Sequence, residues 1–120
     1  MAHGKEVLDE LRPQTRDLRK LIPDVWTPFA GLHGHALGDG ALDGKTKELI
    51  ALAIAVSKQC DGCIASHARG AARKGATTQE VAEALGVALL MNGGPATVYG
   101  PRALAAFTEF TEFTDPDEHR

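Results

Sequence analysis

The chain of 120 residues is poor in aromatic side chains, cysteine and positive charge. Aromatic residues make up 5% of it, which argues against a core built mainly from large rings, whereas alanine occupies 19 positions. The formal net charge is −3, and this argues against a nucleic-acid-binding protein, because phosphate contacts need a concentrated basic surface. Since each alanine buries little area, we expect part of the stability of this chain to lie at subunit interfaces.

Long apolar runs are also missing. The longest one, Leu49 to Val56, has eight residues, whereas about 20 are needed to span a bilayer as a helix. The first six residues become charged at once and contain no apolar signal segment. Apolar residues nevertheless make up 43% of the sequence and charged residues 24%, a balance typical of a folded chain. The sequence therefore predicts one soluble, cytoplasmic domain over residues 1–120, with no membrane and no nucleic acid among its partners.

The spacing of the apolar residues is helical throughout, so the predicted fold class is all-α. The expected helices cover about residues 6–22 with an interruption at Pro13, then 24–32, 45–58, 64–74, 78–91 and 96–113. The glycine-rich stretch from residue 31 to residue 44 is expected to become a loop at its later end. Residues 115–120 are expected to form a frayed polar tail.

Several helix ends have recognisable capping residues. Asp43 is a predicted N-cap, Gly75 suits the position after a helix end, and Thr77 with Glu80 has the form of a capping box. The segment Leu49 to Val56 is apolar on every side of its helix, so it is expected to be surrounded by protein.

The two cysteines of the chain, Cys60 and Cys63, form a C-x-x-C motif, and His67 follows four residues later. On a helix, residues 63 and 67 lie one turn apart and about 40° around the axis, so Cys63 and His67 share a face. Cys60 lies at the start of that helix, where free backbone N–H groups stabilise a thiolate. Two neighbouring thiols with a base one turn away are the components of a dithiol redox site.

Glu48 joins this group if the chain reverses near residues 57–59. The descent from Val56 to Glu48 then covers about 12 Å and the return from Cys60 to His67 about 10 Å, so the two side chains stand at similar heights on antiparallel helices. A carboxylate at this height orients an imidazole and holds its proton. Glu48 also borders the most apolar run of the chain, where an unpartnered carboxylate is costly.

Other interpretations of these residues stay open. The cysteines can be buried small hydrophobic residues, or Cys60, Cys63 and His67 can bind zinc with Glu48 or His33 as fourth ligand. A thioredoxin-like site expects a strand before the motif, and a c-type haem site expects histidine directly after the second cysteine, where this chain has Ile64.

His33 and His35 form an H-x-H pair that is expected to lie in a surface loop, with a place for His33 in a substrate pocket as the alternative. The larger rings are expected to be core or interface anchors. Two of them on the last helix, Phe110 and Phe113, are candidates for a subunit contact.

Three segments resemble the carboxymuconolactone decarboxylase/AhpD-like superfamily: Lys47–Ala53, Cys60-x-x-Cys63-x-x-x-His67 and Gly75-Ala76-Thr77-x-x-Glu80. The similarity covers about residues 42–107, the predicted core of the domain. The resemblance implies an AhpD-like helical bundle with a central buried helical hairpin, assembled as a trimer or a hexamer.

The resemblance also implies the roles of the site residues. Cys63 is the thiol that attacks the hydroperoxide, Cys60 resolves the resulting sulfenic acid as a Cys60–Cys63 disulfide, and His67 with Glu48 forms the proton relay. An external dithiol, such as a lipoylated protein, reduces the disulfide, and no bound cofactor or metal is needed.

One position departs from the family pattern. Peroxidases of this family have a histidine directly before the second cysteine, where this chain has Gly62. Thiol–disulfide exchange without peroxidase activity is therefore one alternative function. A lactone-processing enzyme of the decarboxylase type and a non-catalytic zinc-binding or assembly module are the others.

Overall fold

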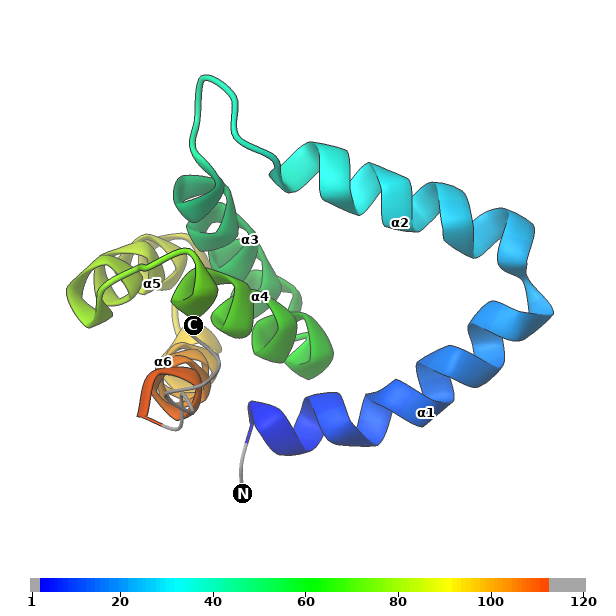
Figure 1. The fold of residues 1–120 in the computed structure, drawn as a ribbon. Coiled ribbons are helices and arrows are strands. Elements are labelled where there is room, and N and C mark those ends of the chain that lie inside the picture. Colours follow the sequence, from blue (N-terminus) through cyan, green and yellow to red (C-terminus); the bar gives the residue numbers. More distant parts are fainter. Residues whose placement is uncertain (1–2, 113–120) are drawn as a thin grey trace.

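The computed structural model describes residues 3–112. This part of the chain is built from helices without strands, which confirms the all-α prediction (Figure 1). The helices are α1 (Lys5–Leu21), α2 (Pro23–Leu37), α3 (Gly44–Lys58), α4 (Asp61–Arg73), α5 (Thr78–Asn92) and α6 (Ala96–Glu112). Among the described residues, none of these helices combines the length and the apolar character that a membrane span requires. The predicted polar tail and Phe113 lie outside the described residues.

Helices α3 and α4 form an antiparallel hairpin, and local signals determine where each begins. The Asp43 carboxylate accepts a hydrogen bond from the Thr46 N–H at 2.8 Å, which confirms the predicted N-cap of α3. Gln59 adopts a left-handed conformation with φ 54° and ends α3. Cys60 then caps α4. The chain therefore reverses within residues 57–61, as the height argument for Glu48 requires.

The core lies between α3, α4, α5 and α6. Small side chains let these helices approach closely: Ala65, Ala68 and Ala71 of α4 are fully buried. Phe107 of α6 is the largest fully buried side chain of the described residues. Phe110 is buried as well, so the prediction of a subunit contact at that ring is wrong, because α6 turns it into the core of its own chain.

Helices α1 and α2 form an arm beside this bundle, and neither contains a buried residue (Figure 1). Two boundary predictions for the arm are wrong. Helix α1 continues through Pro13 without an interruption. Helix α2 continues past Gly31 and Gly34 to Leu37, so His33 and His35 lie on a helix and not in a loop. Glycine and proline lower helix propensity, but they do not prevent a helix that other residues favour.

The apolar run of α3 is covered on one side only. Leu52 and Val56 face the core and are buried, whereas Ile50 and Ile54 are 46% and 53% exposed. The expectation that protein surrounds this segment is therefore wrong for the single chain. Apolar residues on a helix face predict that the face is buried, but they do not say whether the same chain or another chain covers it.

The start of α5 is stabilised by a capping box and by a salt bridge to α3. Thr77 and Glu80 form the predicted capping box. The second carboxylate oxygen of Glu80 lies 2.8 Å from the ammonium group of Lys45 on α3. The hydrogen bond from Lys45, followed by that from the Thr77 backbone, lowers the pKa of Glu80 below its ordinary value of 4.5. The same pair raises the pKa of Lys45.

The substitution Glu80→Gln is expected to reduce the loss of stability in acid. A glutamate whose pKa is lowered by folding stabilises the protein above its ordinary pKa, and this contribution disappears as the pH falls through the lower folded value. Glutamine still accepts the Thr77 N–H but has no charge for Lys45. The difference between the melting temperatures at pH 7 and pH 3 should therefore shrink. Glu83→Gln, on the same helix beside the neutral Gln79 side chain, is the control; an equal effect of both substitutions would contradict the assignment.

Candidate functional site

The two cysteines lie at the start of α4 and form a disulfide bond with a Cα–Cα distance of 5.2 Å. Cys60 is the N-cap, and its sulfur accepts a hydrogen bond from the Cys63 N–H at 3.2 Å. Cys63 is exposed and Cys60 is partly exposed. The pair is therefore bonded, at a helix N-terminus and within reach of solvent. A buried structural role for these cysteines does not agree with this placement.

Glu48 of α3 and His67 of α4 meet across the hairpin. Their Oε2 and Nδ1 atoms lie 2.8 Å apart, which confirms the predicted proximity. Glu48 is 7% exposed and is the one buried charged residue among residues 3–112. An ionised carboxylate can only accept a hydrogen bond, so Nδ1 of His67 donates and Nε2 keeps a lone pair for an incoming proton. Cys63 lies one helical turn before this imidazole.

Gly70 provides the space that the Glu48 carboxylate occupies. A Cβ atom built on Gly70 would overlap the carboxyl group of Glu48. The missing side chain therefore lets a carboxylate from α3 lie directly against α4, next to His67. Gly70 was not among the site residues expected from the sequence. Its signal is a glycine inside an otherwise alanine-rich helix, where glycine costs about 1 kcal/mol relative to alanine.

Arg69 adds a positive charge near this carboxylate. Burial, and then the like charges of Arg73 and Arg12, lower the pKa of Arg69, while Glu48 acts in the opposite direction. An arginine stays charged under these conditions. Its guanidinium group therefore places a positive charge near the Glu48 carboxylate.

His33 reaches the same site from α2. Its ring stacks on that of His67, with centroids 5.9 Å apart and planes inclined by 20°. The sequence analysis placed His33 in a surface loop, with a pocket as the alternative, and so missed this contact. Gly62, between the cysteines, lies under α1: a Cβ there would come within 2.8 Å of the Leu11 side chain. The end of the Leu11 side chain therefore lies directly against residue 62.

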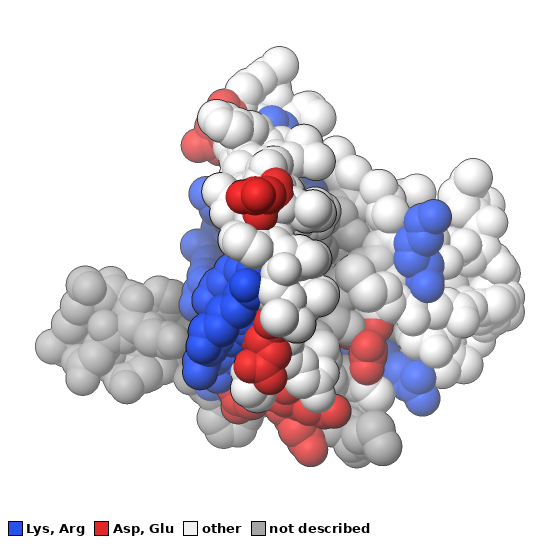
Figure 2. Space-filling view, turned by 90° about the vertical axis from the view of Figure 1, so that its right-hand side faces the viewer, with Lys and Arg blue, Asp and Glu red and all other residues white. Residues whose placement is uncertain are grey.

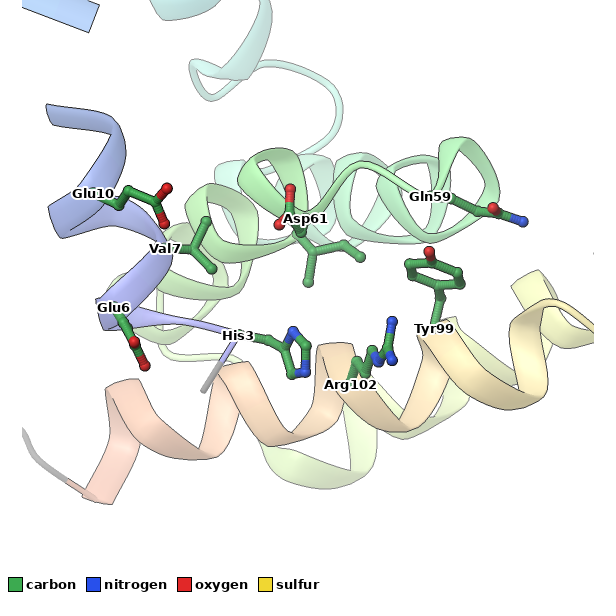
Figure 3. Close-up of a pocket in the computed structure, with 9 residues that line it drawn as sticks. His3, Glu6, Val7, Glu10, Gln59, Asp61, Tyr99 and Arg102 are labelled. Carbon is green, nitrogen blue, oxygen red and sulfur yellow. The ribbon is translucent and has the colours of Figure 1, made fainter. Parts of the chain in front are cut away.

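A cavity of about 600 Å³ is lined by residues that are neighbours of Cys60 in the sequence. It lies between the start of α1, the residues on either side of Cys60, and α6 (Figure 3). Tyr99 and Arg102 of α6 line it, and the Arg102 guanidinium lies 5.2 Å from the centre of the Tyr99 ring. Gln59 and Asp61 flank Cys60 and also face the cavity, so a molecule bound there lies next to the disulfide segment.

Residues 3–112 contain no group of three or more histidine, cysteine, aspartate or glutamate side chains arranged to hold a metal ion. The zinc alternative needs the sulfurs of Cys60 and Cys63 as thiolates. In this structure they are bonded to each other.

Comparison with known proteins identifies the family. The carboxymuconolactone decarboxylase family model matches residues 23–111. The chain belongs to the carboxymuconolactone decarboxylase family. A crystal structure of a family member from Legionella pneumophila, in its apo form, superimposes with a TM-score of 0.85 at 45% identity, covering 88% of this chain and 95% of that one.

Two curated proteins are also similar to this chain over most of their length. An uncharacterized protein of Cupriavidus necator is 40% identical over 86% of this chain and 91% of its own length. An uncharacterized protein of Haemophilus influenzae is 39% identical over 87% of this chain and 92% of its own length. The family includes enzymes, and the solved structure from Legionella pneumophila has the same fold as this chain.

The substitution Gly70→Ala is expected to displace the Glu48 carboxylate from His67. Overpacking of this kind costs about 1–3 kcal/mol of stability. Denaturant unfolding should show this loss, and ¹⁵N NMR of the His67 ring should show that Nδ1 has lost its partner. Gly86→Ala, in α5, is the matched control. A Cβ there meets no described atom within 4 Å, so alanine should stabilise that helix by about 0.5–1 kcal/mol. Unchanged His67 signals in a stable Gly70→Ala variant would contradict the role of Gly70.

Proposed function

We propose that this protein is a dithiol oxidoreductase that reduces hydroperoxides, hydrogen peroxide or alkyl hydroperoxides, through a Cys60–Cys63 disulfide cycle. The observation that carries the proposal is the Glu48–His67 hydrogen bond of 2.8 Å, held one helical turn from a cysteine pair at the start of α4. A buried carboxylate that orients an imidazole next to an exposed thiol is an arrangement for activating a nucleophile.

The first half of the cycle is oxidation. The Cys63 thiol gives its proton to Nε2 of His67, and the thiolate attacks one oxygen of the hydroperoxide. The O–O bond breaks, Cys63 becomes a sulfenic acid, and the leaving alkoxide takes a proton to become an alcohol. The Cys60 thiol then attacks the sulfenic sulfur, so that the S–S bond forms and water leaves. Two electrons have passed from the two thiols to the hydroperoxide.

The second half is reduction by an external dithiol. One of its thiolates attacks the Cys60–Cys63 bond to form a mixed disulfide, and its second thiol completes the exchange. The net reaction converts a hydroperoxide and a dithiol into an alcohol, water and a disulfide. A lipoylated protein is the proposed reductant, and the cycle needs no bound cofactor or metal, because the cysteine pair stores the electrons.

Thiol–disulfide exchange without peroxidase activity is the second candidate function. Gly62 favours it, because the relay histidine of the family's peroxidases is missing at this position and the Leu11 side chain of α1 lies close to residue 62. A decarboxylase acting on a lactone needs no cysteine pair, so its activity would persist after both cysteines are replaced.

Stopped-flow mixing of the reduced protein with hydrogen peroxide and with an organic hydroperoxide separates these functions. Mass spectrometry then gives the oxidation state of the cysteines. The proposed function requires one equivalent of hydroperoxide to disappear as the Cys60–Cys63 disulfide forms. If the disulfide form of an external dithiol oxidises the cysteines but neither hydroperoxide is consumed, the protein catalyses thiol–disulfide exchange instead.

The two cysteines are expected to differ when each is replaced. Cys63→Ser should abolish hydroperoxide consumption, because the attacking thiol is gone. Cys60→Ser should leave a single turnover and trap a sulfenic acid on Cys63, which a dimedone adduct reveals by mass spectrometry. If Cys63→Ser keeps the first turnover and Cys60→Ser loses it, the assignment of the two roles is reversed.

We also propose that the protein works as a homo-oligomer, a trimer or a hexamer. Among the large apolar side chains that stay exposed in the described chain are Val25, Phe29 and Leu32 of α2, Ile50 and Ile54 of α3, and Val87, Leu90 and Met91 of α5. Figure 2, viewed onto the bend between α1 and α2, shows areas without lysine, arginine, aspartate or glutamate beside clusters of charged residues. Large exposed apolar side chains in this number are typical of a chain that associates with another.

Sedimentation velocity should therefore give the mass of a trimer or a hexamer. Leu90 is 80% exposed in the single chain, and burying a leucine contributes about 2 kcal/mol. Leu90→Arg should weaken self-association by at least about tenfold. Gln79→Arg adds the same charge at the other end of α5 and should leave the mass unchanged. A monomeric native protein would contradict the proposed assembly.

A further inference from the structure

His33 lies against the imidazole that the proposed cycle uses. Its ring stacks on His67 with a centroid distance of 5.9 Å and a plane angle of 20°, within the range of attractive offset stacking. The two rings come from different helices, since His33 is on α2 and His67 is on α4. The ring of His67 is thus held at Nδ1 by Glu48 and on one face by His33.

The arm that carries His33 also contacts α4 at Gly62, between the two cysteines. A Cβ at Gly62 would come within 2.8 Å of Leu11 on α1, so α1 approaches α4 at the point where a side chain would otherwise stand. Helix α2 follows directly after α1 and brings an imidazole to His67. The two helices of the arm therefore both contact α4, through Leu11 at Gly62 and through His33 at His67.

We propose that His33 is a positioning residue that stabilises the protonated form of His67 during the dithiol cycle. When His67 takes the proton of Cys63, it becomes a cation beside a thiolate. The π face of a neutral ring attracts such a cation, so the stacked His33 ring favours the imidazolium–thiolate pair over the neutral pair. The inference rests on the proposed function, in which His67 activates Cys63.

The charged groups near this pair come from three helices. Glu48 of α3 is hydrogen-bonded to Nδ1 of His67. Arg69 of α4 interacts electrostatically with Arg73 of the same helix, with Arg12 of α1 and with Glu48. Variants at residue 33 leave all of these groups in place. A change in the reactivity of Cys63 in such variants therefore reports on the ring at residue 33.

The test compares two apolar replacements that differ in their π face, His33→Phe and His33→Leu, with His35→Leu as the control on the same helix. All are made in a Cys60→Ser background, so that Cys63 is the single thiol of the chain. The readout is the rate of alkylation of Cys63 by iodoacetamide at pH 7, which reports the thiolate fraction. In the same variants, proton NMR of the His67 ring reports the stacking through its ring-current shift.

The expected result is a rate within about twofold of the parent for His33→Phe and a decrease of about fivefold for His33→Leu. The His67 ring-current shift should persist in the first variant and disappear in the second. His35→Leu should match the parent. Equal rates for both His33 variants, whether as fast as the parent or equally slow, would overturn the inference, because the π face would then make no difference.

This comparison is separate from the test of the function itself. Alkylation needs no peroxide, so a native protein that consumes no hydroperoxide refutes the proposed peroxidase cycle without affecting the result for His33. Conversely, if the native protein and the His33→Leu variant consume hydroperoxide at the same rate, the peroxidase cycle stands and the positioning role of His33 is refuted.

Discussion

The hydrogen bond between Glu48 and His67 is the interaction around which the site is organised. It joins the two helices of the central hairpin, and it places the one buried charge of the described residues next to an imidazole. A buried carboxylate without a partner is costly. The hydrogen bond therefore gives the Glu48 carboxylate its partner and orients the His67 imidazole at the same time. Stability and chemistry therefore depend on the same contact.

Small residues make this contact possible. The Glu48 carboxylate fits against α4 because Gly70 has no side chain, and α1 fits over the start of α4 because Gly62 has none. Both glycines lie inside α4, where alanine would give a better helix. Their cost is offset by the close approach of a functional group in one case and of a neighbouring helix in the other. The alanine-rich composition of the bundle serves the same purpose over its whole core.

Much of this architecture was predictable from the residues. The capping residues Asp43 and Thr77, the reversal before Cys60 and the equal heights of Glu48 and His67 all follow from short-range rules. The errors lie in the arm and on the outer faces. Pro13 does not end α1, Gly31 and Gly34 do not end α2, and the apolar side of α3 at Ile50 stays open.

The sequence by itself determined the helices, the spacing of the cysteine pair and His67, and the height of Glu48, because each depends on residues close along the chain or on the fixed rise of a helix. Tertiary structure alone decided that Gly70 makes room for the carboxylate, that His33 stacks on His67, and which apolar faces the chain covers itself. These features depend on how segments far apart in the sequence approach each other. The spacing of apolar residues along one helix does not determine which other helix packs against it.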